Sequence, residues 1–187
     1  MLPKNLFVGI DCDLKSFTCR LLNDQGDILA KTELPNSLKG AERLQDKIIQ
    51  TMQQYDLNKL TVGTEATNLY DFHIAEFILH SEKLSSYSLL FYRLNPKLVK
   101  YFKKNYPDTD KTDDNDAFFI AERLRFGHLP HPYHSNQLYS PLQRLTRYRF
   151  HLAHSTTREK NFFLSHLLPY APLKEMRRAN PNISSEF

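Results

Sequence analysis

Short apolar runs separated by turn residues open the chain and predict strands ahead of any helix. Residues 5–11 form an apolar run that ends in Asp11, which predicts a buried strand with a carboxylate at its C-terminal end. Residues 17–22 and 27–34 flank a turn-forming segment, residues 23–26, typical of a hairpin. The N-terminal part of the chain therefore predicts three consecutive strands joined by hairpins.

Apolar positions at helical spacing then alternate with further apolar runs. Residues 38–55 and 69–83 predict amphipathic helices, because their apolar side chains recur every three or four positions. Residues 60–64, which lead into Glu65, and residues 87–94 predict two more strands. The order strand, strand, strand, helix, strand, helix, strand indicates an α/β fold with a mixed sheet and helices on its faces, the order found in ribonuclease-H-like domains.

The rest of the chain predicts helices and one break. A lysine-rich helix follows Asn95-Pro96, and another helix begins near Thr112. Pro130 and Pro132 prevent residues 128–134 from being helical throughout. We expect an α/β domain over residues 1–127, a linker over 128–134, a basic helical, coiled-coil-like extension over 135–170 and a frayed tail over 171–187.

The charge is unevenly distributed along the chain. The 187 residues carry a net charge of +4, yet residues 117–187 hold ten Lys/Arg against four Asp/Glu, or +6, and the first 116 residues are therefore at −2. An acidic first part followed by a basic part predicts chemistry in the former and a polyanionic partner bound to the latter. A basic helix face that simply contacts solvent would give the same charge distribution.

Composition excludes several classes of protein. No apolar stretch is long enough to span a membrane and no signal-peptide pattern opens the chain, so we expect a cytoplasmic protein without a membrane partner. Two cysteines, Cys12 and Cys19, lie in a region of predicted strands. They support neither a disulfide framework nor a four-ligand zinc site, and we expect both to be buried and reduced.

Four acids stand where the predicted sheet would gather them. Asp11 and Glu65 each end an apolar strand, and Asp113 and Asp116 share one face of a helix N-terminus. Each acid alone has a structural explanation, for example a favourable interaction with the helix dipole. A carboxylate at the end of a buried strand is nevertheless costly unless it is paired or binds a metal, and two such strand ends occur here. Carboxylates held close together are the ligands of two-Mg²⁺ sites that act on phosphodiesters.

Three blocks of sequence resemble a known family. Phe-Val-Gly-Ile-Asp at residues 7–11, Gly-Thr-Glu-Ala-Thr-Asn at 63–68 and Lys-Thr-Asp-Asp-Asn-Asp-Ala at 111–117 are similar to the three motifs of the DEDD transposases of insertion sequences. These belong to the one-hundred-and-ten group, which includes the pilin-inverting recombinase Piv. The basic segment that follows also resembles this family, so the similarity extends over about residues 5–168.

The resemblance implies a function, a fold and a set of site residues. It implies a RuvC-like catalytic domain for strand cleavage and transfer in transposition, with Asp11, Glu65, Asp113 and Asp116 as ligands of Mg²⁺ or Mn²⁺. It also implies a partner that is DNA, a structured guide RNA or both. The nucleic-acid-binding residues would be Arg144, Arg147, Arg149, Arg158 and Lys160. An apolar face on this extension predicts a homodimer or a higher homo-oligomer.

The sequence departs from the family pattern in two respects. Family members commonly have a small residue and Ser-Lys after the first Asp, whereas here Asp11 is followed by Cys12, Asp13, Leu14 and Lys15. Family members also carry a nucleophilic serine in a C-terminal domain, which we expect this chain to lack. We therefore expect the chain by itself to be incomplete as a transposase.

Two other classes of protein remain open from the sequence. The opening Gly-Ile-Asp strand and hairpin are also typical of actin-like or sugar-kinase-like ATPases. Those domains need glycine-rich phosphate-binding turns, and the five glycines here are not clustered. A non-catalytic nucleic-acid-binding module is the second alternative, although it leaves the four acids unexplained.

Overall fold

The computed structural model describes residues 4–66, 69–104, 106, 113–135 and 139–170. The chain divides into two compact units with the boundary after Ser135. No helix within the described residues is long and apolar enough to cross a membrane.

The first unit is built on one five-stranded sheet. Its strands are β1 (Asn5–Cys12), β2 (Ser16–Leu22), β3 (Ile28–Pro35), β4 (Lys59–Glu65) and β5 (Ser88–Leu94), in the order β3-β2-β1-β4-β5. β2 is antiparallel to both β1 and β3, whereas β1, β4 and β5 run parallel. This confirms the predicted mixed sheet of a ribonuclease-H-like α/β fold. The C-terminal ends of β1, β4 and β5 consequently lie at one edge of the sheet.

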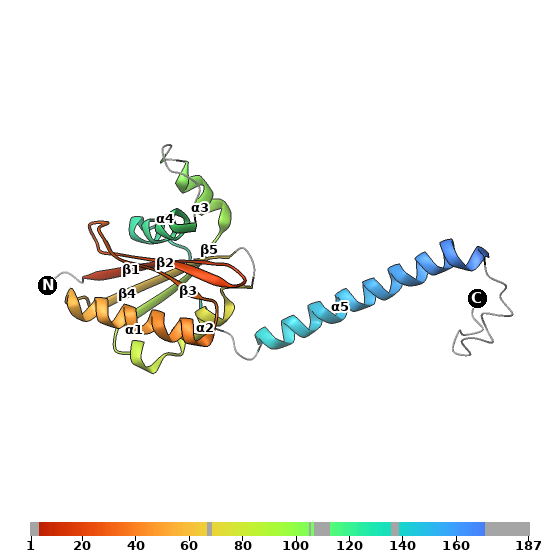
Figure 1. Cartoon of the computed structure of the whole chain (residues 1–187), viewed down its shortest axis with the longest axis horizontal. Helices are drawn as coiled ribbons and strands as arrows, with labels where there is room; N and C mark the ends of the chain where they lie inside the picture. The colour runs from red at the N-terminus through yellow and green to blue at the C-terminus, as the bar shows by residue number, and fades with distance from the viewer. Residues whose placement is uncertain (1–3, 67–68, 105, 107–112, 136–138, 171–187) are drawn as a thin grey trace. The chain divides into compact units, whose positions relative to one another are not determined.

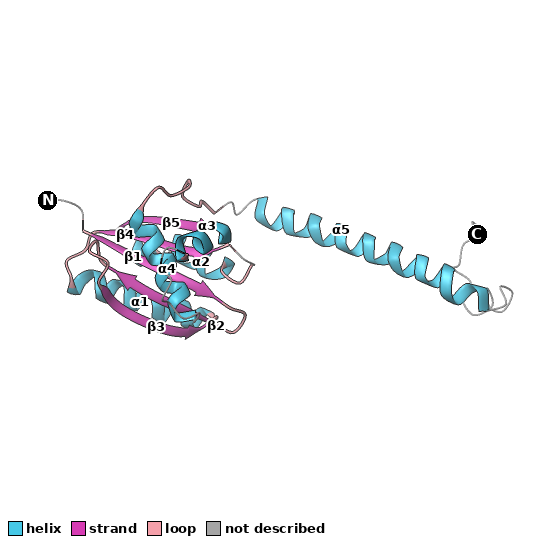
Figure 2. Ribbon diagram, turned by 90° about the horizontal axis from the view of Figure 1, so that it is seen from above, coloured by secondary structure: helices cyan, strands magenta, loops and turns pink. Residues whose placement is uncertain are grey.

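Helices cover both faces of this sheet (Figure 1). α1 (Leu38–Gln54) and α2 (Phe72–Leu79) lie on one face, and α3 (Pro96–Lys103) and α4 (Asp113–Phe126) lie on the other. Each face has its own apolar core: Val8, Ile10 and Val62 pack on the α1 side, and Phe7, Ile120 and Leu124 on the α4 side. Figure 2 shows the strands from above, with α4 running across them.

The helix predicted over residues 69–83 is shorter than expected. α2 covers only Phe72–Leu79, and Asp71 immediately before it is held in a buried ion pair. Ser81 then begins a separate 3-10 turn, Glu82–Leu84, by accepting a hydrogen bond from the Leu84 amide. The prediction was wrong in length because amphipathic spacing continues through both pieces.

Glycines in two neighbouring strands let α4 approach the sheet closely. A Cβ atom on Gly9 of β1 would lie 2.1 Å from the Ala117 carbonyl oxygen and 2.4 Å from the Ala121 amide nitrogen. A Cβ atom on Gly63 of β4 would lie 2.9 Å from a methyl carbon of Leu124. Only glycine permits this contact, so the two glycines set the position of α4 over β1 and β4.

Residues 127–135, which include the segment expected to be a linker, contain neither helix nor strand. They nevertheless contact the sheet, because the Tyr133 amide donates a hydrogen bond of 2.7 Å to the Phe91 carbonyl in β5. Leu129 packs against the core on the α4 side.

The second unit contains α5 (Tyr139–Phe162), followed by a short π-helix (Phe163–Leu167) and a 3-10 turn (Leu168–Tyr170). No described residue of α5 is buried. Its large apolar side chains, including those of Leu142, Leu145 and Phe150, are mostly exposed. Within the described part of α5, these apolar side chains are therefore not part of a core.

Candidate metal and nucleic-acid sites

Asp11 and Glu65 lie at the C-terminal ends of adjacent parallel strands, Asp11 next to last in β1 and Glu65 last in β4, on the same side of the sheet. Side chains alternate between faces along a strand. Ile10 and Thr64, which are partners in the register of β1 and β4, lie on the α1 side, so the residues that follow them face α4. The two carboxylates therefore lie side by side at the C-terminal edge of the sheet, and both are half-buried.

Asp116 in the first turns of α4 approaches the same edge. Burial raises the pKa of Glu65, the ammonium of Lys103 lowers it and the Asp116 carboxylate raises it. Asp116 itself forms an ion pair with Lys103, the last residue of α3. Glu65, Asp116 and Lys103 thus lie within electrostatic range of one another.

Asp113 begins α4, three residues before Asp116, but its side chain lies outside the described part of the structure. Within the described part, no group of three or more His, Cys, Asp or Glu side chains is arranged as a metal site. The backbone therefore brings Asp11, Glu65 and Asp116 to one edge without closing their carboxylates around a common point, and the four-ligand site stays a prediction.

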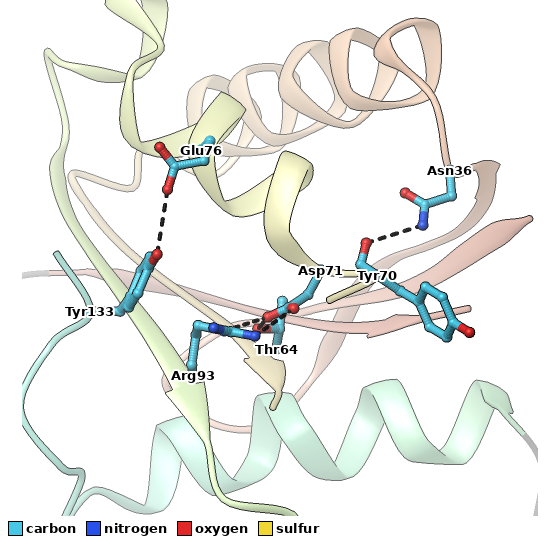
Figure 3. A network of polar contacts seen from close by, with 7 residues as sticks. All are labelled: Asn36, Thr64, Tyr70, Asp71, Glu76, Arg93 and Tyr133. Carbon is cyan, nitrogen blue, oxygen red and sulfur yellow. Dashed lines mark hydrogen bonds and ion pairs between the residues drawn. The ribbon is translucent and has the colours of Figure 1, made fainter. Parts of the chain in front are cut away.

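A buried ion pair supports this edge from the α1 side (Figure 3). The Asp71 carboxylate accepts two hydrogen bonds of 2.7 Å from the Arg93 guanidinium and one of 2.9 Å from the Thr64 hydroxyl. The Asp71 side chain is only 1% exposed. Because Thr64 directly precedes Glu65 and is paired with Arg93 across the sheet, the ion pair ties the ends of β4 and β5 together.

Two further contacts extend this network. The Asn36 side-chain amide donates to the carbonyl of Asp13 at 2.7 Å and to that of Tyr70 at 3.1 Å, which joins the segments that follow β1 and β4. The Arg93 guanidinium carbon lies 5.6 Å from the centre of the Tyr133 ring, a cation–π contact. Sequence reasoning missed these residues, since an isolated Asp and Arg 22 positions apart give no periodic signal.

α5 carries a basic stripe along one face. Successive residues of an α-helix are rotated by about 100°, which groups side chains three and four positions apart. Two histidines and three of the arginines expected to bind nucleic acid fall within an arc of about 80°. We call these five residues the basic stripe: Arg144, Arg147, His151, His154 and Arg158. Arg149 and Lys160, the other two expected residues, lie on a different face.

Apolar side chains form a second stripe on α5. Four of them recur at spacings of three, three and four residues, within an arc of about 120° that includes Arg149. We call these the apolar stripe: Leu142, Leu145, Tyr148 and Leu152. Phe150 lies outside it, near His154, whose ring centre is 4.2 Å away. α5 thus has a basic face and a second, mainly apolar face that also carries Arg149.

The chain is similar to one known family and, more distantly, to solved structures. The family model of the DEDD transposases of the IS110 group, described as Transposase, matches residues 8–172. No curated protein matches. A solved structure of Thermus thermophilus RuvC is 11% identical with a TM-score of 0.46, and one of the same organism's RuvC in complex with a Holliday junction substrate is 13% identical with the same TM-score. Each match covers 68% of this chain and 99% of the other.

Proposed function

Because the chain belongs to the DEDD transposase family of the IS110 insertion sequences, we propose that its first unit is the metal-dependent catalytic domain for DNA strand cleavage and transfer. The observation that carries this proposal is the close approach of α4 to the sheet at Gly9 and Gly63. That approach brings Asp116 to the edge where β1 and β4 deliver Asp11 and Glu65. We include Asp113 as the fourth ligand from the family pattern.

The residues at this edge fit a hard divalent cation. All four proposed ligands are carboxylates, the donors that Mg²⁺ and Mn²⁺ prefer. Burial raises the pKa of Glu65, the Lys103 ammonium lowers it, and the Asp116 carboxylate raises it further, so Glu65 already senses both a cation and a second carboxylate. Bound there, the metal would polarise the scissile phosphate and neutralise charge on the leaving oxygen. The carboxylates would fix its position against the sheet.

We propose that the basic stripe of α5 binds the nucleic acid, DNA or a structured guide RNA. Its three arginines repeat along one face, as needed to follow a phosphate backbone. Arg149 and Lys160 belong to the same proposal, with a smaller contribution because they lie on another face.

The glycines argue against the ATPase alternative. Gly9 and Gly63 are covered by α4, and Gly26 lies in the β2–β3 turn with a positive φ of 89°. Each of the three has a role in packing or in a turn. Among the described residues, no pair of glycines is thus placed to form a phosphate-binding loop.

Titration with Mn²⁺ tests the metal site. We expect Glu65→Gln to weaken Mn²⁺ binding at least about tenfold, the scale of one lost carboxylate interaction of about 1.4 kcal/mol. The matched control is Glu42→Gln, which removes the same charge from an exposed position on α1 and should leave the affinity unchanged. The Mn²⁺ affinity of both variants is obtained from the electron paramagnetic resonance signal of the free ion during the titration. Equal affinities for Glu65→Gln and the wild type would refute the site.

A further inference from the structure

The ammonium group of Lys103 already lies at the acidic edge. Its Nζ pairs with the Asp116 carboxylate, and the two side chains are only 25% and 24% exposed. The same Nζ lies 5.9 Å from the centre of the Phe119 ring, so it is held between the end of α3 and the first turns of α4. It also lowers the pKa of Glu65, which means that one positive charge acts on two of the proposed ligands.

The neighbouring lysines of α3 do not share this position. Lys100 is exposed, and the Nζ of Lys104, just beyond the helix, lies 5.3 Å from the Tyr101 ring centre. Neither forms an ion pair with a described side chain. Of these three lysines, only Lys103 is placed at the acidic edge, so its ion pair does not follow simply from the high lysine content of the helix.

We propose that Lys103 is an internal counter-cation of the metal site, which a divalent metal must displace from Asp116 in order to bind; this inference rests on the proposed function. Carboxylates that converge on one edge repel one another unless a cation is present. Lys103 supplies that cation while the site holds no metal. A lysine suits this role because its ammonium is a point charge on a flexible stem, which can move away without unfolding the helix.

The ion pair between Lys103 and Asp116 makes metal binding at this edge less favourable. A metal gains the Asp116 oxygen only by breaking an existing, partly buried ion pair, so Lys103 weakens metal binding in the absence of nucleic acid. The released ammonium then stands next to the bound metal, where a phosphate oxygen is its natural new partner. Lys103 thereby disfavours a loaded site that has no substrate.

Mn²⁺ affinity without nucleic acid tests the proposal on the whole chain. We expect Lys103→Met, which keeps an unbranched apolar stem, to tighten Mn²⁺ binding about tenfold, the scale of one charge interaction near a protein surface. Lys100→Met removes the same charge from the same helix and should change the affinity less than about twofold. Circular dichroism confirms that each variant is folded.

Lys103→Arg gives an independent test. A guanidinium can hold a carboxylate through two hydrogen bonds, so this variant should weaken Mn²⁺ binding while the net charge stays the same. Unchanged or weaker binding in Lys103→Met, or equal effects at Lys103 and Lys100, would overturn the counter-cation role. Failure of the metal site itself is a separate result, because Glu65→Gln would then bind Mn²⁺ as the wild type does.

Discussion

Single residues decide how closely α4 lies on the sheet. Gly9 and Gly63 face the same helix, but their neighbours differ in kind. Around Gly9 the nearest atoms belong to the backbone of Ala117 and Ala121, whereas around Gly63 they are the methyl carbons of Leu124. A side-chain end can shift by rotation, and a helix backbone can shift only if the whole helix moves.

This difference predicts unequal effects of the same substitution. We expect Gly9→Ala to lower the free energy of unfolding by about 3 kcal/mol or more, because the added methyl group forces α4 outward. Gly63→Ala should cost about 1 to 2 kcal/mol. Urea denaturation monitored by circular dichroism gives both values. A smaller loss for Gly9→Ala than for Gly63→Ala would show that α4 is not held against β1 as described.

At the scale of elements, the sequence predicted the sheet well. Apolar and alternating segments bounded by turn residues placed all five strands within a few residues of their bounds. The helix before Glu82 was predicted too long, since periodicity does not register the buried ion pair of Asp71 with Arg93 that precedes its first turn. Tertiary contacts of this kind are not encoded in local spacing.

The candidate site was predictable only in part. Asp11 and Glu65 could be singled out as candidates because an acid at the end of an apolar strand is conspicuous, and in the structure both lie at the edge that Asp116 approaches. Lys103 was indistinguishable from the other lysines of its helix, because its role depends on α4 packing against α3. Its contact with Asp116 spans 13 positions and has no signature in the sequence.

The basic stripe of α5 predicts which arginines contribute to nucleic-acid binding. We expect Arg147→Ala/Arg158→Ala to weaken binding to a DNA oligonucleotide and to reduce the salt slope of log Kd by about 2, one for each lost phosphate contact. Arg149→Ala/Lys160→Ala removes the same charge from another face and should reduce the slope less. Fluorescence anisotropy at several salt concentrations gives the Kd of both double variants for the oligonucleotide, and hence the two slopes. Equal slopes in the two double variants would mean that charge alone, and not the basic stripe, governs binding.

At the scale of the whole molecule, the apolar stripe predicts self-association. Exposed apolar side chains at spacings of three and four residues are stabilised when a second helix covers them. We propose that this helix is α5 of another copy, which gives a homodimer or a higher homo-oligomer. Leu145 and Phe150 are similarly exposed, at 66% and 65%, but only Leu145 lies in the stripe.

A negative charge introduced at position 145 or at position 150 tests whether self-association uses the apolar stripe. We expect Leu145→Glu to convert the oligomer into a monomer, since a carboxylate at this position would have to lose its hydration in the apolar contact between the two helices. Phe150→Glu should leave the assembly intact. Light scattering coupled to size-exclusion chromatography gives the mass of each variant. A wild-type chain that remains monomeric at high concentration would refute self-association through α5.

The hydrogen bond from Tyr133 to Phe91 has a consequence for the outer strands. A sheet that is not closed exposes unpaired backbone groups at both margins, and these recruit strands from other molecules into aggregates. At β5 the Tyr133 amide occupies one such group. At β3, the opposite margin, Lys31, Glu33 and Pro35 are exposed and disfavour pairing with another strand. Both margins of the sheet thus resist edge-to-edge pairing with strands of other molecules, so self-association through α5 would not have to compete with fibre formation through the sheet.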